Sequence, residues 1–319
     1  MPEKAVAAIK TRGARWQTGD RSPDGRKIGL VIEGGGMRGV CSGGGAVALA
    51  SMGFTDLFDG VYATSAGVMN ASYFLSNQPE LGISVYYDCL ASRKFINPFR
   101  PWKILDVDYV FNHVVTVAKP LDVQSILASR TNFYVALMDK RQGKGFMIDV
   151  KKTRAPLLNV LKAATAIPVL YNRTVHVDGI ACMDAGLSIP FPIEQAIADG
   201  CTDLLVLLTR PPTFVCLAPN WISRMLFKLI CGLNNAELCR IFAEHGSKET
   251  FLRNLALGKT PPTQKVNIAT VCTDSTEEAL RTSMDRGKLR ASAVRYGRKV
   301  FKIFGRARDD WDLPPLTAI

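Results

Sequence analysis

A short, largely aliphatic run from Lys27 to Glu33 leads directly into three consecutive glycines. Such a run is typical of a buried strand in a parallel sheet, and the glycines indicate a tight turn where the strand ends. The next segment, Val40 to Met52, predicts a helix whose first turn is crowded with glycines and therefore packs closely. The chain thus begins with a strand–turn–helix unit, which favours an α/β sheet.

A second unit of this kind carries a serine at its turn. Phe58 to Thr64 predicts the strand and Ala66 to Leu75 a buried helix, with Ser65 between them. A serine on such a sharp turn has its hydroxyl exposed above the sheet, next to the free N–H groups that begin the helix. Ser65 is therefore a candidate nucleophile, although capping of the helix is an equally common role for serine at this position.

Strands and helices continue to alternate as far as Pro212, which predicts one α/β domain. Further strands are expected at 133–138, 146–150, 174–177, 180–183 and 204–208, and helices at 109–118, 157–165 and 193–199. We expect a tail at residues 1–26, a main domain at 27–212, and a basic, mainly helical extension at 213–319 that packs on it. The extension is predicted to hold helices within 221–257 and a strand at 266–272.

The glycine-rich turn offers backbone donors for an anion. Gly34, Gly35 and Gly36 place adjacent N–H groups where no side chain covers them, as a developing oxyanion requires. Arg38 could add charge or orient the loop. The glycines at 34, 36 and 39 also have the spacing of a dinucleotide-binding loop. That alternative expects an acidic residue at the end of the next strand, which ends in the serine turn instead, so nucleotide binding is the less favoured function.

Asp184 ends a predicted strand and is followed by Ala185 and Gly186, small residues that allow another backbone to come close. As a general base it would accept the proton of the Ser65 hydroxyl, and partial burial would raise its pKa toward the useful range. A triad with His245 has the right chain order. His245 lies in a helix-like stretch, however, where a surface or packing role is favoured over catalysis.

Four motifs occur together along the chain: GGGMRG at 34–39, ATSAG at 63–67, ATAIP at 164–168 and DAG at 184–186. In this order and spacing, from about residue 27 to residue 212, the chain resembles the bacterial-type patatin-like phospholipases. The resemblance implies a three-layer α/β/α hydrolase with a mostly parallel central sheet and a helical C-terminal extension.

By the same resemblance, the protein is a carboxylic ester hydrolase that cleaves fatty-acyl esters of lipids or phospholipids, as phospholipase A and lysophospholipases do. Ser65 and Asp184 would form a dyad without histidine, and the reaction would pass through an acyl-enzyme. The amides of Gly34 to Gly36 would form the oxyanion hole, with help from Arg38. No metal or organic cofactor is implied.

Two positions depart from the family pattern. Ala63 opens the nucleophile turn, which ends at Gly67, where the family usually begins with glycine, and Ala185 follows the aspartate where glycine is usual. A left-handed backbone at Ala185 would cost about 1 kcal/mol. The alternative function is therefore a catalytically weak or inactive membrane-binding protein of this family.

The formal net charge of +12 favours partners of negative charge. Between Arg281 and Arg308 ten residues are basic and only Asp285 is acidic. A helix here could lie on an anionic membrane surface, or its apolar side could simply pack on the domain. No module that binds nucleic acid is recognised, so we expect no specific nucleic-acid partner.

The location of the protein is predicted from what its segments lack. Residues 1–25 contain no apolar core of a signal peptide, and no apolar run approaches the roughly 20 residues of a spanning helix. The eight cysteines form no Cys-x-x-Cys pair and no grouping with histidine at zinc-ligand spacing. We therefore expect a cytoplasmic protein, with or without peripheral attachment to a membrane, and no metal site.

Overall fold

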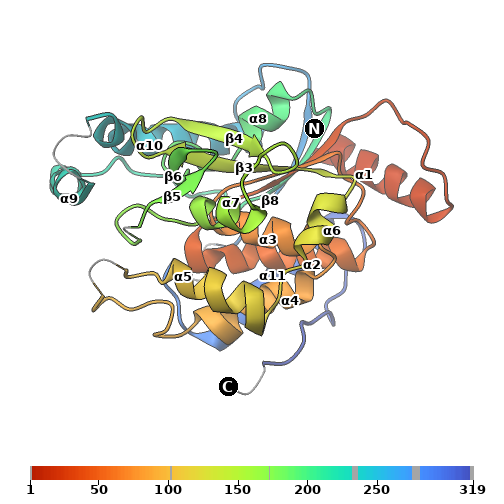
Figure 1. Cartoon of the computed structure of the whole chain (residues 1–319). Coiled ribbons are helices and arrows are strands. Elements are labelled where there is room, and N and C mark those ends of the chain that lie inside the picture. Colours follow the sequence, from red (N-terminus) through yellow and green to blue (C-terminus); the bar gives the residue numbers. More distant parts are fainter. Residues whose placement is uncertain (1, 101–102, 172, 232–235, 275–280, 317–319) are drawn as a thin grey trace.

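A mostly parallel sheet forms the centre of the computed structural model, which describes residues 2–100, 103–171, 173–231, 236–274 and 281–316 (Figure 1). Within these residues the strands have the order β5-β6-β3-β2-β1-β7-β8, and β4 also pairs with β3. The bounds are β1 Ile28–Ile32, β2 Gly60–Ala63, β3 Asn132–Asp139, β4 Gly145–Asp149, β5 Val175–Val177, β6 Ile180–Asp184, β7 Asp203–Leu207 and β8 Asn267–Val271. Strands β3, β2, β1, β7 and β8 run parallel, whereas β4 and β6 are antiparallel to β3, and β5 to β6.

Helices cover both faces of this sheet (Figure 1). The α-helices are α1 Pro2–Gln17, α2 Gly39–Ser51, α3 Ala66–Leu75, α4 Pro79–Ser84, α5 Val107–Tyr109, α6 Val123–Ala128, α7 Leu157–Ala164, α8 Ile193–Ala198, α9 Trp221–Cys231, α10 Ala236–Ala256 and α11 Arg286–Ile303. A 3-10 turn spans Gly36–Arg38, and π-helical segments span Val85–Leu90 and Val110–Ala118. Within the described ranges, no helix combines the length and the apolar character needed to cross a bilayer.

Successive residues of the central strands are buried on opposite faces. In β1, Leu30 and Ile32 join the core beneath α2 and α3, whereas Val31 joins the core beneath α8 and α10. This alternation explains why a buried parallel strand is aliphatic along its whole length. The predicted three-layer α/β/α fold with a mostly parallel sheet is confirmed.

Residues 1–26, predicted as a tail, contain helix α1, which packs against β7 and β8. Its residues Ala5 and Ile9 are fully buried. Arg12 is buried too, and its guanidinium binds Asp24 at 2.8 Å and Asp59 at 2.7 Å. The segment is therefore fastened to the domain by apolar contacts and by a buried cation.

The basic C-terminal segment forms α11, as predicted, and its apolar side is buried against α2. The two helices touch through their backbones, because a Cβ at Gly44 would lie 2.2 Å from the carbonyl oxygen of Ala293. Tyr296 is buried in the same contact and donates hydrogen bonds to the carbonyls of Leu208 and Val271. The apolar side of α11 therefore packs on the domain rather than facing lipid.

Candidate active site

Ser65 stands at the junction between β2 and α3 in a strained backbone conformation. Its φ and ψ are 57° and −134°, in a region that residues other than glycine rarely adopt. A Cβ at Gly67 would lie 2.6 Å from the carbonyl oxygen of Ile32, so the turn needs glycine there. Ala63 simply ends β2 as a buried residue, and its methyl group is accommodated. The geometry is that of a nucleophile turn.

The glycine-rich loop lies directly against this turn. A Cβ at Gly34 would be 2.6 Å from Cβ of Ser65, and Gly35 and Gly36 have φ values of 133° and 61°. Among the described residues, no acceptor is found for the N–H groups of Gly34, Gly35 and Gly36. The buried side chain of Arg38 packs along Gly35. The loop therefore holds backbone donors beside Ser65 that can receive an anion.

Asp184 reaches the same place from the antiparallel strand β6. It pairs with Leu137 of β3, beyond the point where Val135 pairs with Ala63 of β2. The carboxyl group is 4% exposed, and the Gly186 N–H donates to its Oδ1 at 2.7 Å. Both Ser65 and Asp184 line one cavity. The direction of β6 thus places the carboxylate near the serine turn.

Burial changes the acid–base behaviour of Asp184. It raises the pKa of Asp184 from 3.8 to about 6, while hydrogen bonding by the Ser65 hydroxyl and the Gly186 N–H opposes the rise. Within the described chain, Oδ2 has no hydrogen-bond partner of ordinary geometry. The Ser65 hydroxyl, whose interaction lowers the pKa of this carboxyl group, is the candidate donor to this oxygen.

Ala185 does not adopt the left-handed backbone that the family pattern suggested. It is absent from the residues with positive φ and is fully buried with Ala136 and Met183. The expected cost of a left-handed alanine is therefore wrong, and the methyl group contributes to packing instead.

Ser65 lies where an apolar and a polar cavity meet. The apolar cavity is lined by side chains such as Met69, Tyr73, Val85, Leu90, Phe95 and Val110. The polar cavity is lined by Arg38, Asp184, Arg210, His245, Glu249 and Arg281. Ser65, Gly36, Ile167 and Arg281 line both. A molecule with an acyl chain and a polar end could occupy both cavities at once with its ester at Ser65.

Arg281 comes from the far end of the chain to cover the glycine loop. Its carbonyl oxygen accepts a hydrogen bond from the Met37 N–H at 3.0 Å. A Cβ at Gly36 would lie 2.8 Å from the same oxygen, which explains the glycine at that position. Sequence reasoning assigned Arg281 to a basic surface and missed this contact, because no local pattern links residues 36 and 281.

His245 belongs to a second group of charges in the polar cavity. Its Nδ1 lies 3.1 Å from the carbonyl oxygen of Leu187, and its Nε2 lies 3.2 Å from Oε2 of Glu249. Neither ring nitrogen is hydrogen-bonded to Ser65 or Asp184 in the described contacts. The arrangement does not assemble the alternative triad with His245.

A buried chain of ion pairs connects this second group to the glycine loop. Glu249 pairs with Arg253 at 3.1 Å, and Arg253 also pairs with Glu33, the residue before Gly34. Glu33 accepts hydrogen bonds from Thr209, whose hydroxyl donates to the carbonyl of Gly34 at 2.7 Å. The loop is therefore held from behind by a charged network that sequence spacing did not reveal.

Comparison with known proteins identifies the family of this chain. The model of the family described as patatin-like phospholipase matches residues 30–197, more than half of the chain. The uncharacterized protein YjjU of Escherichia coli (strain K12) is 30% identical over 208 residues, which cover 62% of this chain and only 56% of that protein. The crystal structure of VipD from Legionella pneumophila matches over 90% of this chain and 68% of its own, with a TM-score of 0.48 and 11% identity. Because the family model matches more than half of the chain, the chain belongs to the patatin-like phospholipase family.

Proposed function

We propose that this protein hydrolyses fatty-acyl esters of lipids, with Ser65 as the nucleophile and Asp184 as the general base. One observation carries the proposal: a strained serine, a buried carboxylate and unoccupied backbone donors converge where an apolar and a polar cavity meet. Each of these features is a requirement of acyl transfer through a serine.

In the proposed reaction, Asp184 takes the proton from Ser65 as Oγ attacks the ester carbonyl carbon. The N–H groups of Gly34 to Gly36 stabilise the oxyanion of the tetrahedral intermediate. Asp184 then returns its proton to the leaving alcohol, which leaves an acyl-enzyme. Water gives a proton to Asp184 and attacks the acyl carbon, and the released Ser65 oxygen recovers that proton as the fatty acid departs.

The alternative function, an inactive membrane-binding protein, was suggested by two alanines that depart from the family pattern, and the structure gives neither of them a disruptive role. Ala63 is a buried strand residue, and Ala185 has no left-handed backbone. Neither methyl group obstructs the chemistry proposed for Ser65 and Asp184.

The function is tested by incubating the purified chain with a serine-reactive phosphonate and with mixed phospholipid vesicles. We expect covalent labelling of the peptide that contains Ser65, together with release of free fatty acid. Heat-unfolded protein is the control, because labelling should depend on the folded turn. A folded protein that neither takes up the phosphonate nor releases fatty acid would favour the non-catalytic alternative.

Arg281 is proposed to hold the phosphate of a phospholipid substrate, because this basic residue lines both cavities together with Ser65. Replacing Arg281 with glutamine should raise KM for phospholipid by about 10-fold or more, the worth of one charge-assisted hydrogen bond. Hydrolysis of a short uncharged ester should change little. Lys288→Gln, which removes an exposed charge on α11, is the matched control. An equal loss on both substrates would contradict the assignment.

Helix α9 is proposed as the surface that meets an anionic lipid bilayer. Trp221, Ile222 and Met225 are 73%, 47% and 53% exposed, and Arg224 and Lys228 lie on the same helix. The helix stands at the end of the molecule far from α1 (Figure 1). Apolar side chains flanked by cations suit the interface of an anionic membrane.

The segment that leads into α9 passes beside the polar cavity, because a Cβ at Gly246 would lie 2.9 Å from the carbonyl of Cys216. The double substitution Trp221→Ala and Met225→Ala removes exposed apolar surface from this helix. It should weaken the binding of the protein to anionic vesicles, measured by sedimentation, at least about fivefold. Activity on a soluble ester should stay unchanged. Phe99→Ala, which removes another exposed aromatic ring, is the control. Vesicle binding that survives the double substitution would exclude α9 as the lipid surface.

A further inference from the structure

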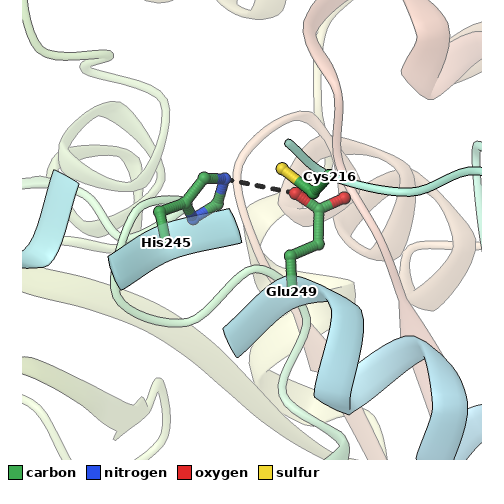
Figure 2. A group of neighbouring side chains, drawn as sticks. All are labelled: Cys216, His245 and Glu249. Carbon is green, nitrogen blue, oxygen red and sulfur yellow. Dashed lines mark ion pairs between the residues drawn. The ribbon is translucent and has the colours of Figure 1, made fainter. Parts of the chain in front are cut away.

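Three side chains of metal-binding type meet at the wall of the polar cavity. The Sγ of Cys216, a ring nitrogen of His245 and a carboxylate oxygen of Glu249 all lie within 4.8 Å of one another (Figure 2). His245 and Glu249 are one turn apart on α10, and Cys216 comes from the segment between β7 and α9. The spacing of cysteines and histidines along the chain did not indicate this group, because His245 and Glu249 lie 29 and 33 residues after Cys216.

The orientation of His245 is that of a metal ligand. Its Nδ1 lies 3.1 Å from the carbonyl oxygen of Leu187, which can only accept, so Nδ1 carries the proton of this hydrogen bond. The other nitrogen, Nε2, is thereby directed at Oε2 of Glu249 (Figure 2). A backbone carbonyl that fixes one ring nitrogen while the other faces anionic groups is the usual support of a histidine ligand.

The spacing of the His245 and Glu249 ligand atoms also fits one small cation. Two ligands at about 2.0–2.1 Å from a tetrahedral zinc ion lie about 3.3 Å apart. The distance between Nε2 of His245 and Oε2 of Glu249 is 3.2 Å. Because Nε2 and Oε2 both have lone pairs, this approach requires a proton or a metal ion between them. A thiolate, an imidazole and a carboxylate are ligands that zinc accepts together.

The charges around the group allow such an ion. Oε1 of Glu249 pairs with Arg253 at 3.1 Å and with Arg210 at 3.5 Å, whereas Oε2 faces His245. A divalent ion would replace the thiol proton of Cys216, because the thiolate is the form of cysteine that binds metal. The two arginines bind Oε1 of Glu249 and leave Oε2 on the side of His245.

We propose that Cys216, His245 and Glu249 form a zinc-binding site with three protein ligands. Sites of this kind retain a position for water or for an oxygen of a bound molecule. His245 and Glu249 both line the polar cavity that Ser65 and Asp184 share, so the ion would add a cation to its wall. The proposal stands on these three side chains and does not depend on the reaction proposed for Ser65.

Equilibrium dialysis of chelator-treated protein against Zn²⁺ tests the site directly. We expect one Zn²⁺ per chain, and Co²⁺ in its place should give the absorption of a tetrahedral ion with a thiolate ligand. Cys216→Ser and His245→Gln should each lower the affinity at least about tenfold, and Cys216→Ser should remove the thiolate absorption. Both variants are checked for folding by circular dichroism.

Matched controls use residues outside the group. Cys239→Ser changes another half-buried cysteine, on α10, and His176→Gln another histidine, on β5. Both should bind Zn²⁺ like the wild type. The proposal is overturned if the wild type binds no Zn²⁺, if Cys216→Ser binds it unchanged, or if the control variants lose as much affinity as the site variants.

Discussion

Replacing Ser65 with alanine, or Asp184 with asparagine, is expected to lower fatty-acid release by at least about a thousandfold. The first change removes the attacking oxygen, and the second removes the base that takes its proton. His245→Gln should remain within a few-fold of the wild type, since the ring faces Glu249 and Leu187. All three variants are compared on phospholipid vesicles after their folding has been verified. A loss in His245→Gln as large as the losses in Ser65→Ala and Asp184→Asn would favour the triad over the dyad.

The pH dependence of this activity follows from the pKa of Asp184, which burial raises to about 6. The carboxyl must be ionised to accept the serine proton, so kcat/KM should rise with pH through an apparent pKa near 6. The raised pKa of Asp184 also makes the free energy of unfolding fall over the pH range in which the activity increases. Because the folded state holds the proton more tightly than the unfolded state, this group's contribution is complete below pH 3.8 and is lost as the pH rises to about 6.

Asp184→Asn should therefore stabilise the fold at pH 8, where the buried carboxylate is charged, by up to about 3 kcal/mol. At pH 4, where the carboxyl is mostly protonated in the folded protein, the gain should nearly vanish. Urea unfolding of both proteins at the two pH values measures the difference. An Asp184→Asn variant that is less stable than the wild type at pH 8 would contradict this account of the pKa.

Arg253→Met is expected to cost about 3–5 kcal/mol of unfolding free energy, the largest effect on stability that we predict. Arg253 is 3% exposed and lies between the buried carboxylates of Glu33 and Glu249. Its removal would leave Glu33 without its cation in the core. The activity should fall as well, because Glu33 and Thr209 hold the carbonyl of Gly34 in place.

The control for Arg253→Met lies on the same helix. Arg240 pairs with Glu237 and Glu244 one turn away, but its side chain is 55% exposed. Arg240→Met should change the unfolding free energy by no more than about 1 kcal/mol, because solvent screens exposed pairs. Equal unfolding midpoints in urea for the two variants would show that burial does not determine the strength of the Arg253 pairs.

Much of the sheet could be predicted because its strands are buried on both faces and end in small-residue turns. The segment at 28–32 is aliphatic throughout and is followed by glycines, so its type and its end were both visible. Helix α1 was missed, although Ala5, Ala8 and Ile9 recur with helical spacing. Alanine is a weak apolar signal, and Arg12, which is charged, is buried only because two distant aspartates pair with it.

Some residues of the candidate site are marked by the local sequence around them, whereas others join the site only through contacts with distant segments. Ser65 and Asp184 could be named as candidates because each follows or ends a strand beside small residues that mark a turn. Arg281, Arg253 and Cys216 were missed as members of the site, because their neighbours there are brought to them only by the packing of distant segments. Contacts over such separations depend on the finished topology, which residue patterns along the chain do not encode.

The contact between Arg281 and the glycine loop also determines when, during synthesis of the chain, the loop can be fully supported. Ser65 and Asp184 leave the ribosome well before residue 281 is joined to the nascent chain. The Met37 amide acquires its acceptor only after residue 281 has been translated, and α2 acquires its partner only after α11 has followed. Under the proposed function, an unfinished chain carries both dyad residues but lacks this support of its glycine loop.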